Sequence, residues 1–272
     1  MPILSDQHLH SSFSGDSDAP METMIRSALD KGLKSMTFTE HLDYDFPLKY
    51  NLSEGYFEVD EQAYHDTLQS FREVYKDRIR LLFGIEMGLK PEVCVQNAQF
   101  LKRQSYDFVI GSVHLVNNED PYYPEYYNGR SERAAMEEYF RCILTNMDAF
   151  MDFDVLGHMD YIVRYTPSKG AFYSPADYTD LTDEILKRII SAGKGIELNT
   201  GAFLKGMSEP NPHRDLIKRY RELGGEIITV GSDAHKPKDI ANGFDRASDI
   251  LKACGFSYYC RFEGRTPVRI KL

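Results

Sequence analysis

Two histidines at the end of the first apolar run have the spacing of metal ligands. His8 and His10 flank Leu9, and in a β-strand residues two apart point to the same face, so both imidazoles can reach one ion. The same alternation predicts Asp6 on that face, one layer below. One expected strand after another ends in such residues, namely His8 and His10, Glu40 and His41, Glu86, His114, His158 and Asp160, and Asp233 and His235.

The distribution of the histidines supports a shared site. Six of the eight histidines fall at these strand ends, whereas His65 in a helical segment and His213 beside Pro212 are interpreted as surface residues. Six imidazoles with Glu86 and Asp233 exceed the roughly three protein ligands that one catalytic zinc needs. The set therefore predicts two or three divalent ions, and mixed nitrogen and oxygen ligands suit Zn, Mn or Fe.

Alternating strand and helix signals place these strand ends together. Apolar runs predict strands over 3–9, 35–40, 80–87, 107–113, 154–158, 195–199 and 226–232. Helices are expected between them over 18–29, 58–77, 91–105, 131–151, 174–193, 212–223 and 239–253. Strand-then-helix order implies parallel strands with right-handed crossovers. About seven such units without a Gly/Ser linker favour an α/β fold in which residues 1–272 form one closed barrel domain, with all strand ends on one rim.

Three segments lie outside the repeating units. Residues 257–262 and 267–272 predict two short extra strands around Glu263-Gly264-Arg265. The loops 42–57 and 115–130 are long for such units, and each follows a strand that ends in a histidine. Loops on that side of a barrel usually shape the substrate pocket, and the second carries Tyr122, Tyr123, Tyr126 and Tyr127.

Composition limits the class of protein. No apolar run among the 272 residues approaches membrane-spanning length, and the N-terminus lacks the features of a signal peptide, so a cytoplasmic protein is expected. The net charge of −10 argues against a nucleic-acid surface and suits a cationic substrate. The cysteines form no C-x-x-C pair and are expected to be reduced and outside the site: Cys94, Cys142, Cys254 and Cys260.

The ordered set of motifs resembles the polymerase and histidinol phosphatase (PHP) family. The motifs are His-x-His at 8–10, Glu-His at 40–41, Glu86, Ser-x-His at 112–114, Gly-His-x-Asp at 157–160 and Gly-Ser-Asp-x-His at 231–235. The resemblance implies a distorted (β/α)7 TIM-like barrel with a trinuclear metal site at its C-terminal rim. The segment 157–161 and the lack of a polymerase region are most similar to the stand-alone phosphatases of histidine biosynthesis. They imply hydrolysis of L-histidinol phosphate to L-histidinol and phosphate by metal-activated hydroxide.

The resemblance also implies which residues hold each ion. Many family members carry a histidine in the loop after the first strand, but residues 11–18 contain none. Asp16 is the best substitute, since Asp18 is better interpreted as a helix cap. The implied sets are His8, His10, Glu86 and Asp233 for the first ion, Glu86, His114 and His158 for the second, and His41, His235 and Asp16 for the third.

Four further residues are candidates for contact with the substrate. Asp160 could protonate the leaving oxygen or orient the attacking water, or else accept a hydrogen bond from a ligand imidazole. Glu40 could contact the substrate ammonium or orient His41. Arg164 and Lys205 are candidate phosphate clamps.

Other functions remain compatible with parts of the pattern. A phosphodiesterase or nuclease, or a phosphatase of another small monoester, could use the same scaffold, although the acidic balance counts against a polynucleotide. A metal-dependent amidohydrolase shares His-x-His on the first strand but usually has a bridging lysine on the fourth, and 112–114 contains none. A non-catalytic metal-binding protein is disfavoured because the ligand set is complete.

Overall fold

Seven parallel strands form a nearly closed barrel in the computed structural model, which describes residues 3–272. The strands pair in chain order. The last strand returns to the first, because the His10 amide donates to the Ala234 carbonyl at 2.9 Å and the Asp233 amide donates to the His8 carbonyl at 2.7 Å. The predicted α/β barrel is confirmed, with β1 at Ser5–Leu9, β2 at Ser35–Leu42, β3 at Arg80–Gly88, β4 at Phe108–Ser112, β5 at Val155–Leu156, β6 at Gly195–Asn199 and β7 at Ile228–Gly231.

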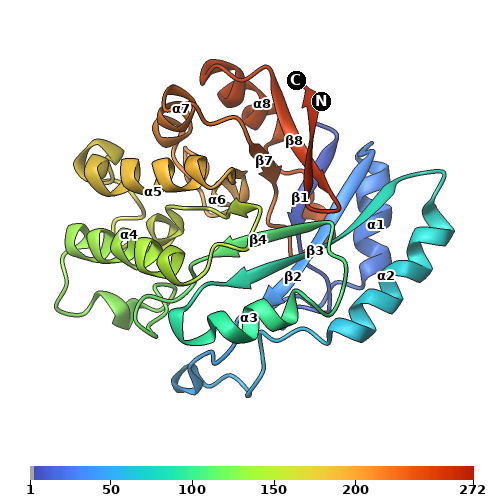
Figure 1. Cartoon of the computed structure of the whole chain (residues 1–272), viewed down its shortest axis with the longest axis horizontal. Coiled ribbons are helices and arrows are strands. Elements are labelled where there is room, and N and C mark those ends of the chain that lie inside the picture. Colours follow the sequence, from blue (N-terminus) through green and yellow to red (C-terminus); the bar gives the residue numbers. More distant parts are fainter. Residues whose placement is uncertain (1–2) are drawn as a thin grey trace.

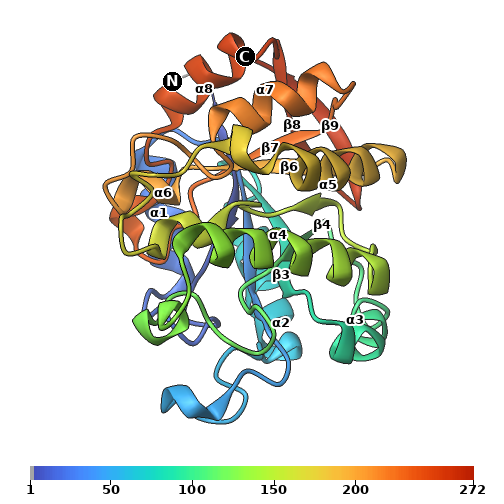
Figure 2. The same ribbon diagram turned by 90° about the vertical axis from the view of Figure 1, so that its left-hand side faces the viewer.

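Helices surround the barrel, with α1 and α2 on one side of the strands and α4 and α5 on the other (Figures 1 and 2). Short 3₁₀ turns join or extend several of them, including η4 at Tyr161–Tyr165 and η6 at Pro237–Asp239. No helix within the described residues is both long and apolar enough to cross a membrane. The helices are α1 at Met21–Asp30, α2 at Glu61–Tyr75, α3 at Cys94–Phe100, α4 at Glu132–Ala149, α5 at Thr179–Ser191, α6 at Gly201–Leu204, α7 at Arg214–Glu222 and α8 at Phe244–Ala253.

The capping residues and starting points predicted for the helices are confirmed at one helix and wrong at two others. The Ser131 hydroxyl caps α4, as predicted, by accepting a hydrogen bond from the Ala134 amide. The prediction that Asp18 caps α1 is wrong, because the residue that precedes this helix is Pro20 and no side chain caps it. Helix α8 begins later than predicted, because Gly243 has a left-handed conformation (φ +70°) that separates the helix from the preceding 3₁₀ turn.

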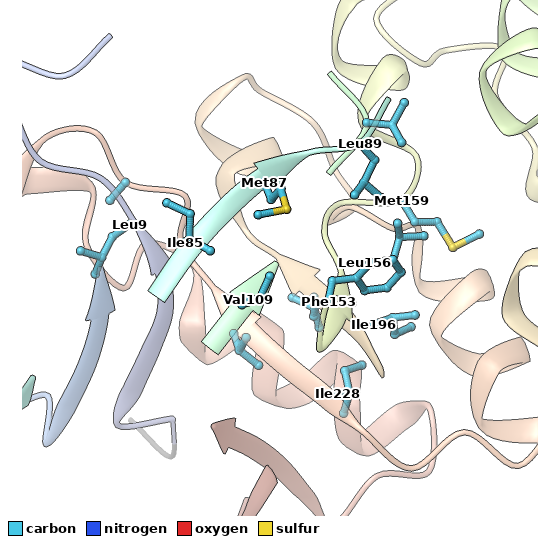
Figure 3. Close-up of a cluster of buried hydrophobic side chains, with 14 of the residues drawn as sticks. Leu9, Ile85, Met87, Leu89, Val109, Phe153, Leu156, Met159, Ile196 and Ile228 are labelled. Atoms are coloured by element: carbon cyan, nitrogen blue, oxygen red, sulfur yellow. The ribbon is translucent and has the colours of Figure 1, made fainter. Parts of the chain in front are cut away.

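Apolar side chains from successive strands form one buried cluster with the helices. Ile85 and Met87 of β3, Val109 of β4, Leu156 of β5 and Ile196 of β6 belong to this cluster (Figure 3). Side chains alternate between the two faces of a strand, so the residues between these apolar ones point into the barrel interior. That alternation brings the polar residues of β3 and β6 into the centre of the molecule.

A C-terminal hairpin covers the opposite end of the barrel from the predicted site. Strands β8 (Tyr258–Glu263) and β9 (Thr266–Lys271) pair antiparallel, which confirms the two extra strands predicted at the end of the chain. The Phe262 amide donates to the Gln7 side chain at 3.1 Å. Phe262 is also part of a second buried apolar cluster, with Phe108, Ile110, Val155 and Cys260.

A bulge in β1 changes the faces on which its side chains lie. The register between β1 and β2 shifts between Asp6 and Leu9. The Asp6 carboxylate accepts hydrogen bonds from the Ser232 amide and hydroxyl, at 2.9 and 2.6 Å, and from the Ala241 amide at 3.0 Å. The prediction that Asp6 lies directly below His8 is wrong, because two-residue alternation requires a regular strand.

Candidate metal centre

A cavity of about 530 Å³ opens at the carboxyl ends of the strands. His8 and His10 are fully buried beneath its polar wall. The structure thus brings all nine predicted ligands to one place. Seven of them line the cavity itself, namely Asp16, His41, Glu86, His114, His158, Asp233 and His235.

The buried carboxylate of Glu86 lies at the centre of the cluster. Several atoms facing it have no hydrogen-bond partner among residues 3–272, including His8 Nε2, His10 Nε2 and Glu86 Oε2. Each such buried polar atom costs about 1–3 kcal/mol unless something satisfies it, and divalent ions would do so. Five imidazole nitrogens lie close to the two Glu86 oxygens: His8 Nε2 at 3.2 Å, His10 Nε2 at 3.5 Å, His41 Nδ1 at 3.0 Å, His114 Nε2 at 3.3 Å and His158 Nε2 at 2.9 Å.

Two further carboxylates complete the ligand set. Asp233 Oδ1 lies 3.7 Å from His8 Nε2 and 3.6 Å from His10 Nε2. Asp16 Oδ2 lies 3.1 Å from His235 Nε2 and 3.6 Å from His41 Nε2, so Asp16 lies beside the two histidines with which it was grouped. Four overlapping groups have ligand atoms close enough for an ion: His8, His10 and Asp233; His8, Glu86 and His158; His41, Glu86 and His114; and His10, His41 and His235.

The imidazoles of the cluster shift the pKa values of the carboxylates beside them. Burial would raise the pKa of Glu86, but the nearby imidazoles of His8, His114 and His41 outweigh it and hold that pKa well below its ordinary value. The charge of His8 and the hydrogen bond from His10 likewise outweigh burial at Asp233 and hold its pKa well below its ordinary value. Both carboxylates are therefore charged at neutral pH, as ligands for a divalent ion must be.

Two carboxylates outside the predicted set hold the imidazoles in place. Glu197 of β6 lies with Oε1 2.6 Å from His8 Nδ1, and its Oε2 accepts from the His158 amide at 3.0 Å. Asp43 lies with Oδ1 2.9 Å from His114 Nδ1. Such partners fix the orientation of a ligand imidazole and leave its other nitrogen for the metal. The sequence signal for Glu197 was its place in the middle of a buried strand, which was overlooked because β6 carries no histidine.

Two glycines leave room for these pairs. A Cβ at Gly231 would lie 2.3 Å from His8 Cβ and 2.5 Å from Glu197 Oε1. A Cβ at Gly88 would lie 2.1 Å from Asp43 Oδ1. Any larger residue would therefore displace the carboxylate that orients an imidazole.

Glu40 lies behind the cluster. Its carboxylate accepts hydrogen bonds from the Ser11 amide and from the hydroxyls of Ser11 and Ser14. The Ser14 hydroxyl lies 3.0 Å from His10 Nδ1 and accepts from the His41 amide at 3.1 Å. Among residues 3–272, Glu40 is not part of the cavity wall, so its placement favours the positioning role over a contact with substrate.

Asp160 does not have the predicted place. Strand β5 ends at Leu156, so the two-residue spacing from His158 no longer puts both side chains on one face. The Asp160 carboxylate accepts from the Asn211 side chain at 2.5 Å and from the His213 amide at 2.9 Å. Within the described residues it neither lines the cavity nor bonds to a site imidazole, so this placement supports neither of the roles considered for it.

The two cationic candidates do line the cavity. The Arg164 guanidinium is buried and donates to Asp233 Oδ2 at 2.9 Å, Asn199 Oδ1 at 2.6 Å and Asn211 Oδ1 at 2.6 Å. Lys205 is exposed just after α6. Arg164 therefore connects a cluster carboxylate to the cavity, and Lys205 is free to reach over it.

The remaining predicted side chains lie elsewhere. His65 and His213 are partly exposed outside the cavity wall, and His213 caps α7 by accepting from the Asp215 amide. All four cysteines are free thiols, and none lines the cavity formed by the described residues.

A parallel barrel with a carboxylate-centred histidine cluster at its rim defines a β/α-barrel protein that can hold several metal ions. Comparison with known sequences identifies the family. A sequence model of the PHP domain matches residues 6–201, and the chain therefore belongs to the PHP domain family.

Individual relatives cover nearly the whole chain. A histidinol-phosphatase of Lactococcus lactis is 32% identical over 95% of this chain and 94% of its own length. A probable histidinol-phosphatase of Clostridium acetobutylicum is 33% identical over 93% of this chain and 94% of its own. A crystal structure of the L. lactis histidinol phosphate phosphatase, complexed with Zn, L-histidinol and phosphate, matches with a TM-score of 0.89 and 30% identity, covering 97% of this chain and 98% of that one.

Proposed function

We propose that this chain is a metal-dependent phosphomonoesterase that hydrolyses L-histidinol phosphate to L-histidinol and phosphate, a step of histidine biosynthesis. The observation that carries the proposal is the Glu86 carboxylate surrounded by five imidazoles at the floor of an open cavity. The L. lactis relative, solved with Zn, L-histidinol and phosphate, supports the substrate. We further propose that residues 1–272 act as one cytoplasmic catalytic domain without a nucleic-acid partner, which suits the net charge of −10.

The residues of the cluster fit two or three divalent ions. His8, His10 and Asp233 form one group, and Glu86 is shared between groups that include His158 and His114. His10, His41 and His235 form the remaining group, with Asp16 beside the last two. When bound, Zn, Mn or Fe at such a site supplies hydroxide near neutral pH and neutralises charge on phosphoryl oxygens.

The protein's own groups position the reacting ester. In the overall reaction the oxygen of water bonds to phosphorus, the bond between phosphorus and the alcohol oxygen breaks, and a proton ends on that oxygen. Arg164 and Lys205 bind phosphoryl oxygens from the cavity wall. Glu197 holds the ring of His8, and Glu40 holds the Ser14 hydroxyl against His10. Asp160 fixes Asn211, which in turn accepts from Arg164.

The test is phosphate release from L-histidinol phosphate beside a panel of phosphomonoesters and bis(p-nitrophenyl) phosphate, with Zn- or Mn-loaded protein. We expect a strong preference for L-histidinol phosphate that is lost on chelation and in His158→Ala. His65→Ala, which removes a histidine outside the cavity, should keep full activity. Faster hydrolysis of the diester would refute the monoesterase. Equal, weak release from every monoester would refute the substrate.

A further inference from the structure

Asp120 is a buried carboxylate in the cavity wall that takes no part in the metal cluster. It lies in the loop 115–130, is 7% exposed and lines the cavity. Its Oδ1 accepts a hydrogen bond from the Tyr122 amide at 2.8 Å. Over residues 3–272, no side chain forms an ion pair with it, and its carboxylate accepts no hydrogen bond besides the one from the Tyr122 amide. Asp120 thus differs from Asp16 and Asp233, each of which faces a histidine.

A buried carboxylate without a cation is unfavourable. Burial raises the pKa of Asp120 to about 6, although the hydrogen bond from the Tyr122 amide and the charge of His114 lower it. Buried carboxylates in proteins are usually paired with a cation or with several hydrogen-bond donors. A ligand cation that entered the cavity would supply that partner.

Aromatic rings connect Asp120 to the metal cluster. The Tyr50 hydroxyl accepts a hydrogen bond from the Asp120 amide at 2.6 Å, which ties the loops 42–57 and 115–130 together. The negatively polarised faces of such rings attract a cation that has lost its hydration water. From the cluster outward, neighbouring ring centroids lie 5.0 Å apart for His158 and Tyr161, 5.0 Å for Tyr161 and Tyr165, 5.3 Å for Tyr165 and Tyr122, 5.1 Å for Tyr122 and Tyr123, and 4.0 Å for Tyr123 and Tyr50.

We propose that Asp120 and this tyrosine wall bind the ammonium group of the substrate, so that Asp120 selects aminoalkyl phosphates over uncharged esters. The inference rests on the proposed function, because the phosphate must lie at the metal cluster for the ammonium to reach Asp120. Of the two basic groups in L-histidinol phosphate, the primary amine is charged at pH 7, whereas a free imidazole is mostly neutral. A site that pairs a buried charge rejects an analogue that lacks the partner.

The experiment compares Asp120→Asn with the wild type on three esters. These are L-histidinol phosphate, 3-(imidazol-4-yl)propyl phosphate (the same ester without the amine) and p-nitrophenyl phosphate. Asparagine keeps the acceptor for the Tyr122 amide and removes only the charge. We expect kcat/KM for L-histidinol phosphate to fall about 10- to 100-fold, with less than a threefold change for the other two esters. Glu119→Gln is the matched control, because Glu119 lies on the same loop but pairs with Arg130.

Each other outcome overturns the inference. An equal fall in kcat/KM on all three esters would show that Asp120 supports the metal cluster. A fall on only the two esters that carry an imidazole would show that Asp120 binds the imidazole. An unchanged preference in Asp120→Asn would show that the ammonium binds elsewhere. Failure of the proposed function is visible separately, since the wild type itself would then not prefer L-histidinol phosphate.

Discussion

Replacing Glu197 by glutamine should weaken metal binding through a change of histidine tautomer. Glu197 accepts from His8 Nδ1 with one oxygen, and from the His158 amide and the Asn199 side chain with the other, at 3.0 and 3.1 Å. Glutamine has only one acceptor oxygen, which the two donors on the second side would retain. Its NH₂ group would then face His8 and donate to Nδ1, leaving the proton on Nε2, the nitrogen that faces Glu86. That nitrogen could no longer bind an ion.

The expected loss follows from two independent magnitudes. A hydrogen bond to a charged group is worth about 1.5–3 kcal/mol. Loss of a partner that orients a ligand typically costs about 10- to 100-fold in metal affinity, or roughly 1.4–2.7 kcal/mol. Competition with a chromophoric chelator would measure the affinity for Zn. Asp154→Asn is the control, because this buried carboxylate pairs with Arg265 away from the cavity. Unchanged Zn affinity in Glu197→Gln would refute the tautomer argument.

Three further outcomes are expected. Gly88→Ala should lower metal affinity about 10-fold in the same chelator assay, because its Cβ would push Asp43 away from His114; an unchanged affinity would contradict this. Chelation should lower Tm, and Zn should restore it, because ions that bind only the folded state stabilise it; a Tm indifferent to both would argue against a metal site. Hydrogen bonds from Arg219 lower the pKa of Asp183, so this pair stabilises the fold above about pH 4 and the contribution is lost as the pH falls through the folded-state pKa. Asp183→Asn should therefore lower Tm at pH 7 and have less effect near pH 3, and an equal shift at both would contradict the assignment.

The sequence predicted the metal-ligand residues better than the residues that orient them. Histidines are scarce, so their recurrence at strand ends was informative, and the repeated strand–helix order required a parallel sheet. All seven strands were found within three residues of the predicted ends. Asp16 was placed by the absence of a histidine in its loop, and it lies beside His41 and His235.

Failures arose where the backbone departs from regular geometry. Asp160 follows a strand that contains only Val155 and Leu156, and Asp6 precedes a bulge, so counting by twos misplaced both side chains. Glu197 was missed for another reason, because a lone acidic residue in a buried strand does not reveal its partner. Its contact with His8 spans 189 residues of sequence and depends on barrel closure.

Closure of the barrel by β7 has a consequence for synthesis of the chain. The His10 amide donates to the Ala234 carbonyl and the Asp233 amide donates to the His8 carbonyl, so the first strand acquires its second neighbour only when β7 and the residues after it have been made. A growing chain therefore carries His8 and His10 on an unclosed edge until Ala234 has emerged. Metal loading should accordingly follow synthesis of β7, and a ribosome-stalled chain that ends before β7 should bind no Zn tightly.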